Sequence, residues 1–209
     1  MKVHTKESQA TMTPEKALQF LTEGNQRFQN NLKANRNLLQ QINDTRDGQF
    51  PFATILSCID SRVSAELVFD QGLGDIFSVR IAGNFVNEDI LGSMEFGCKL
   101  AGTRLVVVLG HTSCGAIKGA CDHARLGNLT KLIQKIEPAV YAVNEPKEEA
   151  LRNSKNLDFV DAVSAKNVEL TIDRIRKESP VLMELEEDGD IKIVGAMYNI
   201  ATGAVDFYS

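Results

Sequence analysis

Two short stretches of the chain carry side chains that can bind a metal ion. Residues 58–62 read CIDSR and residues 111–115 read HTSCG. Zinc accepts thiolate sulfur and imidazole nitrogen as ligands, and a catalytic zinc keeps its fourth position open for water or substrate. Cys58, His111 and Cys114 supply three such ligands. This set therefore predicts one catalytic zinc ion per chain.

The remaining cysteines do not extend this set. Cys121 and His123 lie a turn or two along the helix predicted after Cys114, and we expect them to point elsewhere. A buried cysteine is usually a small hydrophobic core residue, and we interpret Cys98 and Cys121 in this way. In a chain of this length without a secretion signal, metal binding or free thiols are favoured over disulfides. A structural zinc site, which needs a fourth close ligand, is therefore disfavoured.

Asp60 and Arg62 follow the first cysteine and add acid–base chemistry. Two thiolates and a neutral imidazole cancel the charge of zinc. Such a metal lowers the pKa of its bound water less than a zinc ion held by three neutral imidazoles does. Arg62 offers a planar fork that pairs bidentately with a carboxylate. Paired in this way, Asp60 stays off the metal and orients the nucleophile; unpaired, it can become the fourth ligand. The alternative is that Asp60 caps the following helix and Arg62 forms a surface ion pair.

The predicted secondary structure explains how stretches 53 residues apart can meet. Residues 58–62 follow a predicted strand at 52–57, and residues 111–115 follow another at 104–110. In a parallel sheet, ligand crevices form at the carboxyl ends of the strands. Further strands are predicted at 75–80 and 191–197, with 204–208 adding an antiparallel edge. Helices are predicted at 14–31, 65–69, 89–101, 116–124, 130–143 and 162–177, the first capped by Thr13 with Pro14 following.

Length and composition indicate one α/β domain, residues 1–209, with a mostly parallel sheet covered by helices. Residues 1–12 are predicted to be disordered. Residues 13–50 are predicted to form an N-terminal helical arm, irregular over 32–50. The net charge of −5 and scattered basic residues exclude a nucleic-acid-binding surface. No run approaches the roughly 18 apolar residues of a membrane span, and the polar start lacks a signal-peptide core, which predicts a cytoplasmic protein without a membrane partner.

The paired pattern C-x-D-S-R and H-x-x-C resembles that of the β-class carbonic anhydrases. The likeness extends to residues 23–28 (EGNQRF), 77–84 (FSVRIAGN) and 92–96 (GSMEF). It runs from about residue 13 to the end and is weakest between residues 140 and 190. The resemblance implies a zinc lyase (carbonate dehydratase) that interconverts carbon dioxide and bicarbonate.

The resemblance also implies roles for individual residues. The implied zinc ligands are Cys58, His111 and Cys114, and the implied catalytic dyad is Asp60 with Arg62. The implied substrate-binding residues are Gln49, Phe77, Ala82, Phe96 and Gly115. Members of the plant type usually carry tyrosine where Phe96 stands. Some bacterial members carry tryptophan where Ile55 stands, as part of an inhibitory bicarbonate site, so the resemblance favours a form in which Asp60 stays off the metal.

Assembly and two competing functions complete the expectations. In the family that the chain resembles, the N-terminal helix lies across a partner subunit and both chains contribute pocket residues. We therefore expect a homodimer or a higher homo-oligomer such as a homotetramer. A hydrolase of carbonyl sulfide or carbon disulfide would use the same ligands on the same scaffold. A non-catalytic zinc-binding regulatory module would have no use for the Asp60–Arg62 pair or Gln49.

Overall fold

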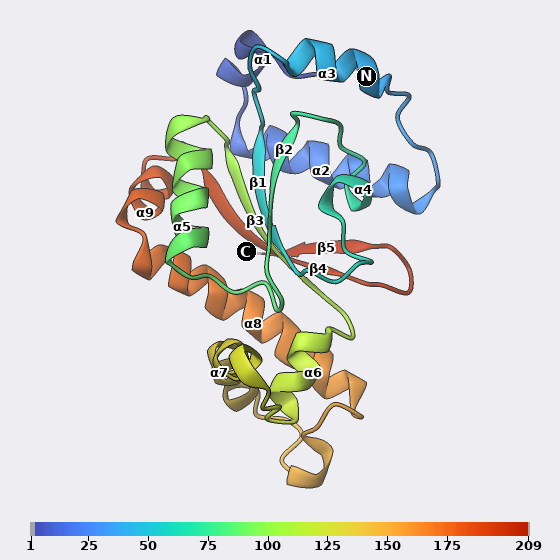
Figure 1. Cartoon of the computed structure of the whole chain (residues 1–209), viewed down its shortest axis with the longest axis vertical. Coiled ribbons are helices and arrows are strands. Elements are labelled where there is room, and N and C mark those ends of the chain that lie inside the picture. Colours follow the sequence, from blue (N-terminus) through green and yellow to red (C-terminus); the bar gives the residue numbers. More distant parts are fainter. Residues whose placement is uncertain (1–2, 209) are drawn as a thin grey trace.

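The core of the molecule is an α/β sheet. Within residues 3–208, which the computed structural model describes, five strands form one sheet in the order β2-β1-β3-β4-β5. The strands are β1 (Ala53–Ser57), β2 (Ile76–Arg80), β3 (Leu105–His111), β4 (Lys192–Tyr198) and β5 (Val205–Tyr208). Strands β1 to β4 are parallel, and β5 pairs antiparallel with β4. This arrangement (Figure 1) confirms the predicted mostly parallel sheet with a C-terminal antiparallel edge strand.

The position of each strand in the sheet follows from its side chains. All seven residues of β3 (LVVVLGH) are buried, as expected for a β-branched strand covered on both faces. Its neighbour β1 is also buried throughout. Strand β2, by contrast, lies at an edge, and none of its residues is fully buried. The sheet therefore has a dry centre and a partly exposed β2 edge.

Helices cover both faces of the sheet and lie beyond both of its ends (Figure 1). They are α1 (Lys6–Ala10), α2 (Pro14–Gln29), α3 (Leu38–Thr45), α4 (Ala65–Val68), α5 (Glu88–Glu95), α6 (Gly115–Cys121), α7 (Gly127–Ala142), α8 (Leu157–Glu178) and α9 (Pro180–Glu187). A π-helical turn spans Phe96–Leu100 and a 3₁₀ turn spans Glu149–Leu151. α2 and α4 pack on one face, and α5, α8 and α9 on the other. α6 and α7 pack against α8 at the end of the sheet opposite α1 and α3.

The N-terminal segment contains more regular structure than predicted. Residues 6–10, inside the lead expected to be disordered, form α1, and residues 1–2 lie outside the described residues. The Gln9 amide donates to the carbonyl oxygens of Pro51 and Ala101 at 2.7 and 2.9 Å, and Met12 is buried in the core. These contacts are made with segments far along the chain, so local polarity alone predicted the wrong state.

Two other helices also differ from the prediction. α3 lies within the stretch expected to be irregular, and Asn37 caps it by accepting from the Gln40 N–H. Its apolar side chains remain largely exposed, so the hydrophobic pattern is a weak signal. α9 was missed although its start is recognisable, since Ser179 caps it and Pro180 occupies the first helical position. The predicted Thr13 cap of α2, by contrast, is confirmed.

No helix among residues 3–208 is both long and apolar enough to cross a membrane. The cytoplasmic location stays a prediction.

Candidate metal centre

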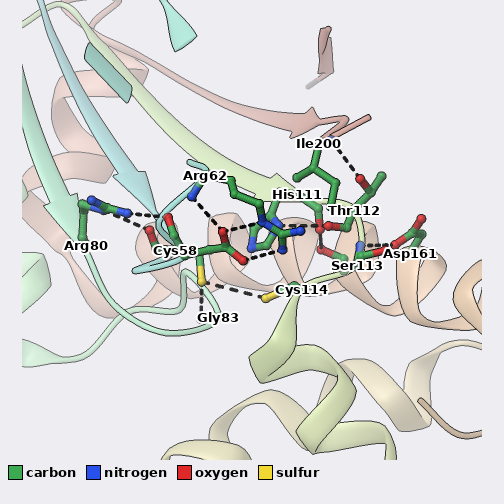
Figure 2. A network of polar contacts seen from close by, with 12 residues as sticks. Cys58, Arg62, Arg80, Gly83, His111, Thr112, Ser113, Cys114, Asp161 and Ile200 are labelled. Carbon is green, nitrogen blue, oxygen red and sulfur yellow. Dashed lines mark hydrogen bonds and ion pairs between the residues drawn. The ribbon is translucent and has the colours of Figure 1, made fainter. Parts of the chain in front are cut away.

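The three predicted metal ligands meet at the carboxyl ends of the two central strands. Cys58 directly follows β1, His111 is the last residue of β3, and Cys114 immediately precedes α6. β1 and β3 are adjacent in the sheet, so their ends bring the two stretches together. The ligand atoms all lie within 4.8 Å of one another, with the two sulfur atoms 3.9 Å apart (Figure 2). All three residues are buried.

The imidazole of His111 is oriented for metal binding. Its Nδ1 lies 3.0 Å from the carbonyl oxygen of Thr112, an acceptor that requires the proton to reside on Nδ1. Nε2 is then the unprotonated nitrogen, and within the described part of the chain it is buried without a hydrogen-bond partner. An orphaned buried acceptor beside two thiols is the donor set that zinc requires. The residues present therefore fit a zinc ion.

The two thiols influence each other's ionisation. The hydrogen bond from Cys114 lowers the pKa of Cys58, while burial opposes this shift and the hydrogen bond from the Gly83 N–H reinforces it. The pKa of Cys114 is raised, first by its role as the donor to Cys58 and then by burial. The two sulfurs are thus close enough for one thiol to hydrogen bond to the other. Cysteine binds zinc as the thiolate, so a lowered pKa at Cys58 suits a metal ligand.

Asp60 lies beside the ligands but faces Arg62 instead of joining them. Arg62 donates from Nε to Oδ1 at 2.9 Å and from Nη2 to Oδ2 at 2.7 Å. The Arg62 backbone N–H also donates to Oδ1 at 2.9 Å. These bonds, the side-chain one first, hold the pKa of Asp60 well below its usual range. The helix-cap alternative does not describe this geometry, since Ser64 is the N-cap residue of α4.

Arg80 is a residue of this site that the sequence analysis did not single out. It ends β2 and donates from Nε to the Cys58 carbonyl at 3.0 Å and from Nη2 to the Asp60 carbonyl at 2.7 Å. Figure 2 shows this arginine reaching the Cys58 loop from the neighbouring strand. The only signal was its presence in the FSVRIAGN stretch, because nothing local to Arg80 indicates its partners.

The predicted substrate-binding residues fall into two groups. Ala82 and Gly115 belong to segments at the metal: Ala82 precedes Gly83, whose N–H points at the Cys58 sulfur, and Gly115 begins α6. Gln49 is exposed and precedes β1, so it lies at the opposite end of that strand from Cys58. The structure does not bring Gln49 to the metal site of its own chain.

Phe77 and Phe96 also lie away from the ligands. Their rings are 6.1 Å apart, and Phe77 pairs with Thr54 near the amino end of β1. Both rings line a pocket of about 830 Å³ between β2 and α5, which extends along β2 to Arg80. Phe96 is 53% exposed. These two aromatic side chains therefore stand on an open surface in the single chain.

The fold and the site together define a class: an α/β protein with a thiolate–imidazole metal centre at the carboxyl edge of a parallel sheet. Comparisons with known proteins agree. The family model described as "Carbonic anhydrase" matches residues 53–205. Carbonic anhydrase 2 of Mycobacterium tuberculosis is 34% identical over 199 residues, which cover 91% of this chain and 90% of that protein. The carbonic anhydrase of Mycolicibacterium smegmatis is 35% identical over 166 residues, covering 77% and 76%. The chain belongs to the β-class carbonic anhydrase family.

Solved structures show the same fold. The β-carbonic anhydrase CcaA matches with a TM-score of 0.72 at 24% identity, covering 92% of this chain and 87% of that one. A Coccomyxa β-carbonic anhydrase in complex with acetazolamide matches with a TM-score of 0.68 at 25% identity, covering 78% and 74%. One of two tetrameric β-carbonic anhydrases from Sordaria macrospora matches with a TM-score of 0.69 at 20% identity, covering 80% and 85%.

Proposed function

We propose that this enzyme is a zinc-dependent carbonate dehydratase, which hydrates carbon dioxide reversibly to bicarbonate and a proton. Cys58, His111 and Cys114 would hold one zinc ion per chain. The observation that carries the proposal is the convergence of two sulfurs and an orphaned imidazole nitrogen within 4.8 Å, beside a carboxylate held by an arginine. Membership of the carbonic anhydrase family supports the reaction.

The proposed mechanism assigns each chemical task to a side chain of this protein. When bound, zinc supplies a Lewis acid that makes water a nucleophile near neutral pH. Asp60 stays ionised because Arg62 engages both of its oxygens. As a fixed acceptor, it binds the remaining proton of the nucleophile and so directs a lone pair at carbon dioxide. Arg62 prevents Asp60 from turning onto the cation. The proton released in each cycle passes to buffer, since no shuttle residue is identified.

The apolar part of the substrate pocket is proposed to come from two copies of the chain. Ala82 and Gly115 would line it from the chain that holds the metal. Gln49, Phe77 and Phe96 would enter from a partner copy, because in their own chain they lie away from the metal centre. Gln49 would then bind an oxygen of the substrate, and the two rings would exclude water. A homodimer is the smallest assembly that provides both sets.

The competing functions have less support. Hydrolysis of carbonyl sulfide or carbon disulfide would need the same ligands, and the named relatives are carbonic anhydrases. A regulatory zinc module would have no need for a carboxylate held by an arginine at 2.7 Å beside the ligands.

Direct assay of carbon dioxide hydration by stopped-flow tests the proposal. We expect turnover that scales with bound zinc, measured by elemental analysis of the same samples. X-ray absorption should find two sulfur neighbours at about 2.3 Å and one nitrogen at about 2.0–2.1 Å. A zinc-loaded protein without hydration activity, or one with another ion at full occupancy, would contradict it.

A further inference from the structure

Three polar side chains of α8 contact backbone next to the predicted metal ligands: two contact the turn from His111 to Cys114, and one contacts Gly83. Asp161 Oδ1 accepts from the Ser113 N–H at 2.7 Å. Ser164 Oγ donates to the His111 carbonyl at 3.0 Å. Asn167 Nδ2 donates to the Gly83 carbonyl at 2.8 Å. The three α8 residues are spaced three apart, so they share one side of the helix.

Two of these contacts reach the segment that carries His111 and Cys114, and the third reaches the turn at Gly83, whose N–H donates to the Cys58 sulfur. Ser113 adopts a left-handed conformation, with φ of 55°, in the turn between His111 and Cys114. The carbonyl that Ser164 binds belongs to His111 itself. Figure 2 shows Asp161 reaching the Ser113 backbone and Gly83 lying below the Cys58 sulfur. The α8 side chains therefore act on the backbone of the His111–Cys114 turn and of Gly83 and not on the ligand atoms.

The Asn167 contact has the most direct chemical consequence. It holds the carbonyl of Gly83, whose own N–H donates to the Cys58 sulfur over 3.4 Å. Gly83 has φ of 77°, and a Cβ atom there would lie 2.4 Å from Ile136 Cδ1, so the turn requires glycine at this position. Hydrogen bonding to a thiolate stabilises its charge and alters its strength as a ligand. Asn167 thus fixes the direction of the donor that the Cys58 thiolate receives.

The close approach of α8 to the sheet depends on a glycine. At Gly110 a Cβ atom would lie 2.6 Å from Val168 Cγ2 and 3.4 Å from Ser164 Oγ. The absence of a side chain at this position allows α8 to lie against the end of β3. Ser164 and Asn167 are 0% and 3% exposed, so water does not compete for these hydrogen bonds.

We propose that Asp161, Ser164 and Asn167 form a positioning stripe that sets the affinity and ligand geometry of the zinc centre. The inference rests on the proposed zinc site and goes beyond it, because it assigns a role to a helix that supplies no ligand. Partners outside the ligand set typically change metal affinity by about 10- to 100-fold. A purely structural role would change the stability of the fold and leave the metal unaffected.

Asn25 provides a matched control for Asn167. It is also 3% exposed and helical, and its amide donates to the carbonyls of Val68 and Gly203, outside the metal-binding loops. Each asparagine is replaced by alanine in a separate variant, Asn167→Ala and Asn25→Ala. Zinc affinity is measured by competition of the zinc-loaded protein with a chromophoric chelator, and ligand geometry by the thiolate-to-metal and ligand-field bands of the cobalt(II) form. Thermal unfolding is recorded for each variant.

We expect Asn167→Ala to lower zinc affinity about 10- to 100-fold and to shift the cobalt bands. Asn25→Ala should lower the unfolding temperature and leave affinity and bands unchanged. Equal zinc affinity and an unshifted cobalt spectrum in Asn167→Ala would overturn the proposal. If the wild-type protein shows no thiolate-to-cobalt band, the proposed zinc site itself is wrong. This result differs from one in which the wild-type band is present and Asn167→Ala leaves it unchanged, which contradicts only the positioning role.

Milder substitutions keep the test decisive if Asn167→Ala does not fold. Asp161→Ala removes the acceptor of the Ser113 N–H, whereas Asp161→Asn retains an oxygen acceptor at the same position. We expect weaker zinc binding in Asp161→Ala and recovery of most affinity in Asp161→Asn. Ser164→Ala should weaken zinc binding in the same direction. Unchanged affinity in both alanine variants contradicts a positioning role.

Discussion

The carboxyl end of the central strands and the β2 edge of the sheet differ in how completely one chain builds them. At the strand ends, three ligands from two sequence segments are buried and lie within 4.8 Å of one another. Arg80 of β2 holds the loop that follows Cys58, and Asp161 and Ser164 of α8 hold the turn from His111 to Cys114. At the β2 edge, Phe77 and Phe96 line an open pocket, and Gln49 is exposed beyond the far end of β1.

This difference separates metal binding from substrate binding. Side chains held by surrounding hydrogen bonds are oriented for a cation, and one folded core supplies those partners here. An apolar pocket for a small neutral gas needs only a wall, which a second copy can supply. We therefore expect the two regions to respond differently to substitution and to dilution.

The largest effect is expected at the ligands. Cys114→Ser or His111→Ala should abolish zinc binding and reduce hydration to the uncatalysed background, because two protein ligands do not retain the ion. Zinc content by elemental analysis and stopped-flow hydration measure both losses. Cys98→Ala is the control, since Cys98 is also buried but lies in a different part of the core. Full zinc occupancy in Cys114→Ser would show that Cys114 is not a zinc ligand and would contradict the predicted metal centre.

The next effect separates catalysis from metal binding. Asp60→Asn should keep its zinc and lose about 10²- to 10⁴-fold in hydration rate, because the amide cannot replace the carboxylate as a charged acceptor. Arg62→Ala should also keep zinc and be nearly inactive, since the freed carboxylate becomes a fourth ligand, visible as an oxygen neighbour in its crystal structure.

A surface pair provides the control for the dyad. Arg46 and Asp47 form an exposed ion pair, so Asp47→Asn should change neither zinc content nor activity. Wild-type rates in both Asp60→Asn and Arg62→Ala would show that the dyad has no part in the reaction.

A smaller effect is expected at the β2 edge. Phe96→Lys should lower activity about tenfold or more while zinc stays bound, because a charge on this face disrupts packing against a second copy. Light scattering should find wild-type protein as a dimer or larger and this variant shifted towards 23.0 kDa, the mass of one chain. Leu126→Lys, at an exposed apolar residue near α7, is the control. A fully active wild-type monomer would refute the two-chain pocket.

The smallest effect on activity is expected in the N-terminal arm, where Asp70 ties Arg27, Arg36 and the Ala34 N–H to the loop after α4. Burial pushes the pKa of Asp70 upwards, but hydrogen bonds, first from Arg27, outweigh it and lower the pKa. The contribution of Asp70 to stability is therefore complete above its unfolded pKa of about 3.9 and is lost as the pH falls through the lower folded value.

Asp70→Asn tests this contribution. It should lower the free energy of unfolding at pH 7 by on the order of 3 kcal/mol, because the neutral amide replaces the carboxylate of two ion pairs, with Arg27 and with Arg36. Chemical denaturation at pH 7 and at pH 3 measures the difference in unfolding free energy between wild type and Asp70→Asn. We expect this difference to be smaller at pH 3. Asp190→Asn, in the more exposed pair with Arg104, should cost less than about 1 kcal/mol. If the difference in unfolding free energy did not change with pH, the claim that ionised Asp70 stabilises the fold would be wrong.

Much of the fold was predictable because its signals are local. The β-branched run of β3, the Thr13–Pro14 start of α2 and the closing hairpin each follow from the preferences of neighbouring residues. α3 was missed because its apolar side chains are exposed and give a weak hydrophobic pattern, and α9 was missed although Ser179 and Pro180 mark its start. α1 was missed because Gln9 finds its partners at Pro51 and Ala101.

The sequence by itself determined the chemistry of the candidate site: two thiols, an imidazole, a carboxylate and a guanidinium, each at a strand end. Only the tertiary structure decided the 3.9 Å separation of the sulfurs and the orphaned Nε2 of His111. It also decided the contact of Arg80 with the Cys58 carbonyl and that of Asn167 with Gly83. It also placed Gln49 at the opposite end of β1 from Cys58. The physical reason is that residue type and spacing encode short-range preferences, whereas distances between segments far apart in the chain arise from the packing of the whole core.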